Sequence, residues 1–214
     1  AIHLAYETFG TLARDRSNAV LVLHALTGDA HVTGEGGADV PGQPTAGWWP
    51  QLVGPGKVID TDRYFVVCPN VLGGCQGSTG PSSLAPDGRV WGSRFPQVST
   101  RDQVGAEARL ADYLGIRTWS LVIGASMGGH RAIEWAVEYP ERVARVAVVA
   151  SGAQTTAEQA AWTHTQLRAI ELDPHWCGGD YHDQPVGPVA GLALARQIAH
   201  VTYRSPKELS ERFG

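Results

Sequence analysis

The chain has 214 residues, of which 43% are hydrophobic and 18% are charged, and its formal net charge is −4. This composition is typical of a folded globular protein and excludes a largely disordered chain. Lysines and arginines form no cluster larger than isolated pairs, so a nucleic-acid-binding surface is not expected.

No apolar run reaches the roughly 18 residues that would span a bilayer, and no basic-then-apolar signal segment opens the chain. Cys68, Cys75 and Cys177 lack metal-ligand spacing, so no metal site is expected. They fit a reducing cytoplasm, in which the thiols serve as small packing residues. The chain begins without Met inside a strand-like stretch and ends at Gly214 directly after a helical one, which suggests a fragment.

The first part of the chain alternates short strand-like runs with long loops. Residues 2–10 alternate in polarity like an antiparallel edge strand, and residues 19–26 are continuously apolar like a central strand covered on both faces. Residues 27–61 are rich in Gly, Pro and Trp and predict a long loop. A second buried strand is expected at 64–70, followed by another glycine-rich loop over 71–96.

The middle of the chain alternates helices and buried strands. A helical period over 99–116 is followed by an apolar run at 119–125, a helix over 128–140 and a fourth buried strand within 142–153. The apolar face of the first helix is formed by Val104, Ala108, Ala111 and Leu114. This alternation predicts an α/β fold, a mostly parallel sheet with helices on both faces.

After residue 154 the pattern changes to helices alone. Amphipathic helices are expected at 155–173, 189–205 and 206–214, and no further buried strand follows. We therefore divide the chain into residues 1–154, the N-terminal part of the core, and residues 155–214, an incomplete helical lid. The C-terminal strands of the core are expected to be missing.

Ser126 lies in the stretch "GASMGG" between an apolar run and a helical pattern. This context predicts a nucleophile elbow, a strand-to-helix turn so sharp that the serine backbone is strained. Gly124, Gly128 and Gly129 are expected to surround it because larger side chains would collide. The hydroxyl of Ser126 would then stand at the carboxyl edge of the sheet as a nucleophile. The alternative is a glycine-rich turn in which the serine only caps the helix.

Two backbone N–H groups are expected to stabilise an oxyanion near Ser126. Met127 N–H lies at a helix N-terminus, and Leu26 N–H lies in the loop after the 19–24 strand. His24 precedes the nucleophile, whereas this fold runs serine, acid, histidine, so it is expected to make loop hydrogen bonds rather than act as the base. His130 is expected to pack or lie at the surface, directed away from the hydroxyl.

Five stretches carry a resemblance to a known family. They are "YETFGTL", "HALTGDAH", "GWWPQLVGPGKVIDTDRYFVVCPNVLGGCQGSTGP", "GASMGGHRAIEWAVEYPERV" and "GLALARQIAHVTYRSP". Together they resemble the homoserine O-acetyltransferase family of α/β-hydrolase-fold enzymes over nearly the whole chain. His130 stands where that family more usually has Met or Ala. Trp48, Trp49 and Trp91 are expected to pack within loops rather than touch a ligand.

The resemblance implies acyl transfer from acetyl-CoA to the hydroxyl of L-homoserine, on the route to methionine. Ser126 would attack the thioester, and the N–H groups of Leu26 and Met127 would hold the oxyanion. Acetyl-CoA would be a co-substrate, with no permanently bound cofactor. A cytoplasmic homodimer, joined through the lid helices, is also expected.

The resemblance implies that Arg196 and Tyr203 border the homoserine pocket. They are seven residues apart on a predicted helix and share a face with Leu192 and Ala199. An arginine on an apolar face requires an anionic partner, which a substrate carboxylate would supply. From periodicity alone, Arg196 could equally extend to solvent.

The acid and histidine of a catalytic triad should follow Ser126 in this fold. The candidates downstream are Asp173, Asp180, Asp183, His164, His175, His182 and His200. All lie in the lid segment rather than after a late strand, so we expect the triad acid and base to be absent from these 214 residues. The chain alone should then be nearly inactive.

Three classes of function stay open at this point. The first is the acetyltransferase, with a succinyl donor or a serine acceptor as variants that the residues do not separate. The second is a serine esterase or thioesterase of the same fold, with water as acceptor. The third is a non-catalytic binding fragment.

Overall fold

The computed structural model describes residues 1–36 and 45–214. Part of the loop expected over 27–61, namely residues 37–44, lies outside the described residues. No helix in the described part of the chain has the length and apolarity needed to cross a membrane.

The chain divides into two compact units. One comprises residues 1–81 and 96–153, and the other comprises residues 82–95 and 154–214. The stretch 82–95, expected as a loop of the core, therefore groups with the C-terminal helices. The interpretation of those helices as a lid stays a prediction.

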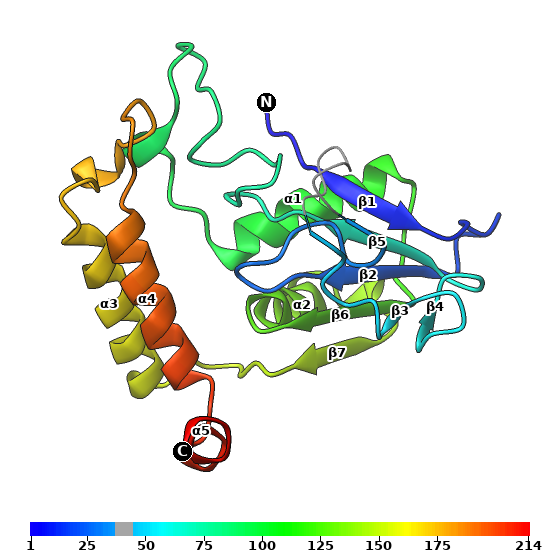
Figure 1. The fold of residues 1–214 in the computed structure, drawn as a ribbon. Coiled ribbons are helices and arrows are strands. Elements are labelled where there is room, and N and C mark those ends of the chain that lie inside the picture. The colour runs from blue at the N-terminus through cyan, green and yellow to red at the C-terminus, as the bar shows by residue number, and fades with distance from the viewer. Residues whose placement is uncertain (37–44) are drawn as a thin grey trace. The chain divides into compact units, whose positions relative to one another are not determined.

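The first unit is built on a five-stranded sheet (Figure 1). In spatial order its strands are β1 (Tyr6–Phe9), β5 (Phe65–Pro69), β2 (Ala19–Leu23), β6 (Leu121–Ala125) and β7 (Val146–Val149). β1 is antiparallel to β5, and all other neighbours are parallel. The predicted edge position of β1 and central position of β2 are both confirmed.

The order of strands places the ends of β2 and β6 at one edge of the sheet. Leu23 of β2 pairs with Gly124 of β6, and all of β2 is buried. Because the two strands are parallel, the segments that follow them leave the sheet on the same side. Residues 24–26 and Ser126 therefore share one edge.

The last strand, β7, is less buried than its sequence predicts. Val146 is 44% exposed, Val148 38% and Val149 39%. The predicted fourth strand is therefore present, but it is not buried as predicted. β7 pairs with β6 along one edge, and no strand of the described residues pairs with the other.

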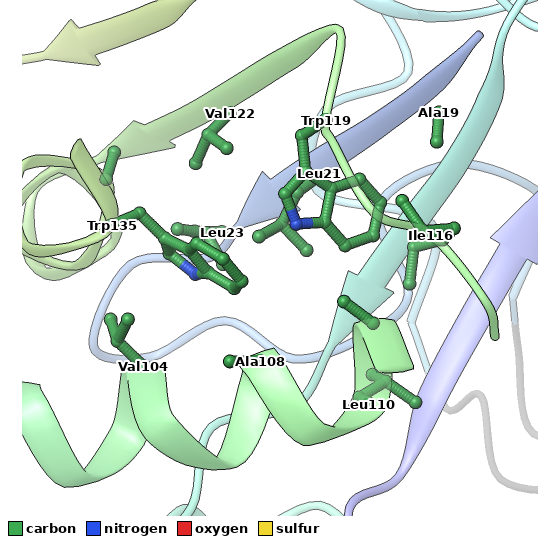
Figure 2. Close-up of a cluster of buried hydrophobic side chains, with 13 residues drawn as sticks. Ala19, Leu21, Leu23, Val104, Ala108, Leu110, Ile116, Trp119, Val122 and Trp135 are labelled. Atoms are coloured by element: carbon green, nitrogen blue, oxygen red, sulfur yellow. The ribbon is translucent and has the colours of Figure 1, made fainter. Parts of the chain in front are cut away.

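Two helices, α1 (Thr100–Tyr113) and α2 (Met127–Glu138), cover one face of the sheet. Figure 2 shows the cluster of buried side chains between them and the strands. Within it, Trp119 and Trp135 meet edge to face with ring centroids 6.3 Å apart. The predicted apolar face of α1 is confirmed at the buried residues Val104, Ala108 and Ala111 and the partly buried Leu114.

The opposite face of the sheet, where further helices were equally expected, is covered in this unit by the long loop after β2. The buried cluster on this face consists of Val20, Val22, Val32, Val53, Ile59, Val66, Cys68 and Ile123. The loop contains an unpredicted parallel pair of two-residue strands, β3 (Val53–Gly54) and β4 (Ile59–Asp60). Trp48 and Trp49 stack on each other, with ring centroids 5.3 Å apart, and both pack against this cluster. This confirms their predicted role in loop packing.

The second unit contains three helices, α3 (Ala157–Glu171), α4 (Val189–Thr202) and α5 (Pro206–Phe213), as predicted. α3 and α4 lie side by side (Figure 1). The two helices can approach closely because Gly191 has no side chain. A Cβ atom at this position would lie 2.5 Å from the carbonyl oxygen of Ala169. The buried residues of α4 are Gly191, Ala195 and Ala199. Trp91 packs edge to face on Phe95, with centroids 6.0 Å apart.

Candidate active site

Ser126 occupies the turn between β6 and α2 with φ 54° and ψ −120°. L-residues rarely adopt such a conformation, and strain of this kind is concentrated at functional positions. Ser126 is exposed, and although it is the N-cap residue of α2, its side chain makes no capping hydrogen bond. The alternative of a simple capping serine is therefore not supported.

The glycines around Ser126 are required by close packing of the main chain. A Cβ atom at Gly124 would lie 2.0 Å from the carbonyl oxygen of Gly128. A Cβ atom at Gly128 would lie 2.0 Å from the carbonyl oxygen of Leu23. One at Gly129 would lie 2.1 Å from a hydroxyl oxygen just beyond β7. The predicted collisions are confirmed, and β2, β6 and α2 meet at this turn.

Hydrogen bonds hold the main chain of the turn in place. Ser126 N–H donates to Val149 O of β7 at 3.0 Å, and Ser126 O accepts from Ser151 Oγ at 2.6 Å. Ser126 O also accepts from the N–H groups of Gly129 at 2.9 Å and His130 at 3.2 Å. His130 is exposed, in agreement with its predicted surface role. The strained serine is thus anchored through its backbone, and its hydroxyl takes no part in that anchoring.

The two expected oxyanion donors belong to the same unit as Ser126. Met127 is the first residue of α2, where an N–H group has no partner within the helix. Leu26 lies in the turn after β2. Among the hydrogen bonds of residues 1–36 and 45–214, none occupies the N–H of Leu26 or of Met127. Both groups are available for an anion, and their role as oxyanion donors stays a prediction.

His24 is buried and held between two main-chain groups. Its Nε2 lies 3.0 Å from the Val71 nitrogen and its Nδ1 lies 2.7 Å from the Ala25 oxygen. An amide N–H only donates, so Nε2 accepts, and the proton of the neutral ring is assigned to Nδ1. Burial, together with the nearby charge of Arg131, lowers the pKa of His24 from 6.5 to about 4. His24 therefore makes loop hydrogen bonds, as predicted, and its ring has no free lone pair with which to act as a base.

The lowered pKa of His24 predicts a pH-dependent stability. Above pH 6.5 the ring is neutral in the folded and the unfolded chain, but between pH 6.5 and about 4 only the unfolded chain takes up the proton. The free energy of unfolding should fall across this window by up to about 3 kcal/mol. Urea titrations across the window should show this loss in the wild type and a smaller loss in His24→Asn. Equal pH dependence in both proteins would contradict the assignment.

A buried ion pair, not predicted from the sequence, lies beneath this edge of the sheet. Arg131 of α2 and Glu107 of α1 are fully or almost fully buried, with Nη1 and Oε1 2.6 Å apart. The other oxygen of Glu107 accepts from Trp135 Nε1 at 2.8 Å, and Arg131 Nη2 donates to the carbonyl oxygen of His24 at 2.8 Å. The sequence did contain a signal for this pair: Glu107 lies within the apolar face of the first helix. A charged side chain buried there requires a partner of opposite charge. The pair fixes the relative positions of α1, α2 and the end of β2.

Arg196 and Tyr203 lie in the second unit. Arg196 is half-buried on α4, and among the described residues it makes no hydrogen bond or ion pair. Tyr203 is the C-cap residue of α4 and is 69% exposed. Leu192 is 51% exposed whereas Ala199 is buried. The predicted helix is present, and these residues lie along it at the predicted spacing, but they differ in burial because Ala199 is covered whereas Leu192 and Tyr203 are exposed.

Two candidates for the triad acid have partners within the second unit. Asp173 accepts from the N–H of Gly191 at 2.7 Å and of His175 at 2.9 Å, and these bonds hold the pKa of its carboxyl below the ordinary value. Asp180 accepts from N–H and Oγ of Ser93, both at 2.8 Å, which ties the segment around Ser93 to this unit. Both carboxylates thus have structural roles. That the triad acid and histidine lie outside these 214 residues stays a prediction.

The cysteines differ in their surroundings. Cys68 is buried, as predicted, and burial raises the pKa of its thiol. Cys75 and Cys177 are exposed, so the prediction of packing roles is wrong for them. Both lie in glycine-rich segments that offer few apolar neighbours. All are free thiols, and no group of three or more His, Cys, Asp or Glu in the described residues could hold a metal ion.

Residues 18–212 match the family model of the alpha/beta hydrolase fold, and the chain therefore belongs to that family. More particularly, it is 62% identical over 214 residues to a homoserine O-acetyltransferase of Thermobifida fusca (strain YX), covering all of this chain and 56% of that protein. The chain thus spans about half the length of the curated relatives it matches.

Two similar solved structures carry the names of different activities, an acetyltransferase and an ester hydrolase. A homoserine O-acetyltransferase from Bacillus anthracis superposes with a TM-score of 0.86 at 35% identity, over 94% of this chain and 54% of that one. An acetylester hydrolase from Corynebacterium glutamicum superposes with a TM-score of 0.83 at 30% identity, over 98% of this chain and 55% of that one. The scaffold is therefore similar to enzymes that differ in the acceptor of an acetyl group.

Proposed function

We propose that the full-length protein transfers an acetyl group from acetyl-CoA to the hydroxyl of L-homoserine through an acetyl-Ser126 intermediate. The observation that carries this proposal is the exposed, non-capping hydroxyl of Ser126 on a strained turn, beside N–H groups with no partner in the described residues. The similarity to homoserine O-acetyltransferases supports the choice of donor and acceptor.

The reaction divides into two balanced half-reactions. In the first, Ser126 Oγ loses its proton to a base and bonds to the thioester carbonyl carbon, the C–S bond breaks, and CoA leaves with that proton. In the second, the homoserine hydroxyl loses its proton to the base and bonds to the acetyl carbon, the bond between that carbon and Ser126 Oγ breaks, and Ser126 Oγ leaves with the proton from the base. The oxyanion of each tetrahedral intermediate would accept from the N–H groups of Leu26 and Met127. The base is expected beyond Gly214.

The test is a product assay on the full-length protein. Acetyl-CoA and L-homoserine should give equal amounts of free CoA and O-acetylhomoserine, measured by a thiol reagent and by mass spectrometry. Parallel reactions with succinyl-CoA, with L-serine and without any amino acid identify donor and acceptor. Release of CoA without an acetylated amino acid would contradict the transferase and favour the second candidate, an ester hydrolase. That candidate is supported by the similarity to the acetylester hydrolase.

Arg196 is proposed to bind the carboxylate of homoserine, because its half-buried guanidinium has no partner among the described residues. Arg196→Ala should lower kcat/KM for homoserine about 100-fold, since a hydrogen-bonded charge pair contributes up to about 3 kcal/mol. Acetylation of Ser126 by acetyl-CoA should be unchanged. Rapid-quench measurement of acetyl-enzyme separates the half-reactions, with Arg204→Ala, on the same chain segment, as a control. Equal damage to both half-reactions would contradict a carboxylate-binding role. Tyr203 is proposed to border the same pocket.

A cytoplasmic homodimer through α3 and α4 completes the proposal. Free thiols at the exposed Cys75 and Cys177 suit a reducing compartment.

Apolar side chains remain exposed on α3 and α4 at Trp162, Leu167, Leu192, Leu194 and Val201. Burial of such side chains stabilises a dimer. Light scattering of the full-length protein should therefore give twice the mass of one chain.

A further inference from the structure

The ring of His24 has defined partners on both nitrogens. Val71 N–H donates to Nε2 at 3.0 Å, which leaves Nδ1–H to donate to the Ala25 oxygen at 2.7 Å. His24 is 1% exposed, so water does not compete for these bonds. The ring is therefore a fixed connection between the start of the loop after β5 and the peptide that follows His24.

The Ala25 oxygen belongs to the same peptide unit as the Leu26 N–H. A trans peptide is planar, so its C=O and N–H point in opposite directions. The Ala25 oxygen accepts from the Gly28 N–H at 3.0 Å as well as from the His24 ring at 2.7 Å, so the turn and the ring together set the direction of the Leu26 N–H. This is the N–H group expected to donate to the oxyanion, and no hydrogen bond among the described residues occupies it.

The main chain of His24 is itself immobilised. Its carbonyl oxygen accepts from Arg131 Nη2 at 2.8 Å, and a Cβ atom at Gly128 would lie 2.8 Å from the same oxygen. A Cβ atom at Gly28 would lie 2.9 Å from the Cβ of His24, so the loop folds back onto this residue. The ring thus acts from a rigid base on α2. Preorganised donors of this kind lower the barrier because they need no reorientation during the reaction.

We propose that His24 is a positioning residue which, through its Nδ1–H bond to the Ala25 oxygen, directs the Leu26 N–H toward the oxyanion formed at Ser126. This rests on the proposed function, in which Ser126 becomes acylated. His24 touches neither substrate nor the reacting atoms. Its neutral tautomer, not its basicity, is what the reaction requires.

Two substitutions separate the donor from the acceptor of the ring. In His24→Asn, the side-chain nitrogen lies where Nδ1 was and can still donate to the Ala25 oxygen. In His24→Gln, the side-chain amide lies where Nε2 was, so the bond to the Ala25 oxygen is lost. We expect His24→Asn to acetylate Ser126 within about tenfold of the wild-type rate, and His24→Gln to be slower by about 100-fold or more, the effect of losing one oxyanion donor. The apparent affinity for acetyl-CoA should not change, since the oxyanion exists only in the intermediate.

Acetylation is measured by rapid quench on the full-length protein, and folding by urea denaturation of each variant. Equal rates for both variants, or a faster His24→Gln, would overturn the proposal while leaving acyl transfer intact. A wild type that forms no acetyl-Ser126 would instead overturn the proposed function. If neither variant folds, long-range ¹H–¹⁵N spectra of the wild-type imidazole decide: a proton on Nδ1 supports the proposal and one on Nε2 overturns it.

Discussion

Ser126→Ala should abolish acetyl transfer in the full-length protein, with a loss of at least about 10⁴-fold in CoA release. The hydroxyl oxygen is the atom to which the acetyl group bonds, and the nearby Ser151 hydroxyl is engaged in a 2.6 Å hydrogen bond to the Ser126 carbonyl oxygen. The fold should be unaffected, because the Ser126 side chain makes no capping hydrogen bond and is exposed. Steady-state CoA release and the mass of protein quenched after mixing with acetyl-CoA measure both consequences.

Ser210→Ala is a matched control for this change. Ser210 is an exposed serine in α5, and loss of its hydroxyl should leave the rate of CoA release within experimental error. Turnover by Ser126→Ala at the wild-type rate would remove Ser126 from the role of nucleophile. An added acetyl mass on Ser126→Ala would show that another residue carries the acyl group.

Gly128→Ala should strongly destabilise the first unit, because the added methyl group would collide with main-chain atoms. The new Cβ atom would lie 2.0 Å from the carbonyl oxygen of Leu23 and 2.8 Å from that of His24. Both neighbours are main-chain atoms at the end of the central strand, so relief requires β2 and α2 to separate. We expect a loss of about 3 kcal/mol or more in the free energy of unfolding, at the upper end for overpacked sites. Chemical denaturation followed by tryptophan fluorescence measures it.

Gly105→Ala tests the same substitution where space is available. Gly105 lies within α1, and a Cβ atom there would meet no other atom within 4 Å. The change should stabilise the protein by about 0.5–1 kcal/mol, because glycine has a low helix propensity. If Gly128→Ala unfolded at the same denaturant concentration as Gly105→Ala, the close contact of α2 with β2 would be contradicted.

The sequence predicts the sheet and the serine turn well because both depend on local signals. Continuous apolar runs mark β2, β5 and β6, and the Gly-rich stretch around Ser126 admits few alternatives to a sharp strand-to-helix turn. The resemblance of five stretches to one family adds the activity, which local patterns alone leave open. These features were within reach because each depends on neighbours in the chain.

Other features depend on partners distant in sequence and were missed. Glu107 and Arg131 are 24 residues apart, and their pairing follows only from the packing of α1 on α2. His24 makes loop hydrogen bonds as predicted, but its partner Val71, 47 positions away, was not predicted. An apolar run such as β7 predicts a strand, but its burial depends on what lies beyond the sheet edge. Distance in sequence, rather than weak propensity, limited the prediction.

The half-covered β7 has a consequence for handling these 214 residues in isolation. An uncovered row of strand N–H and C=O groups flanked by valines is a template onto which another polypeptide can add. Preparations of the isolated stretch should therefore tend toward intermolecular aggregation, whatever the state of the serine turn.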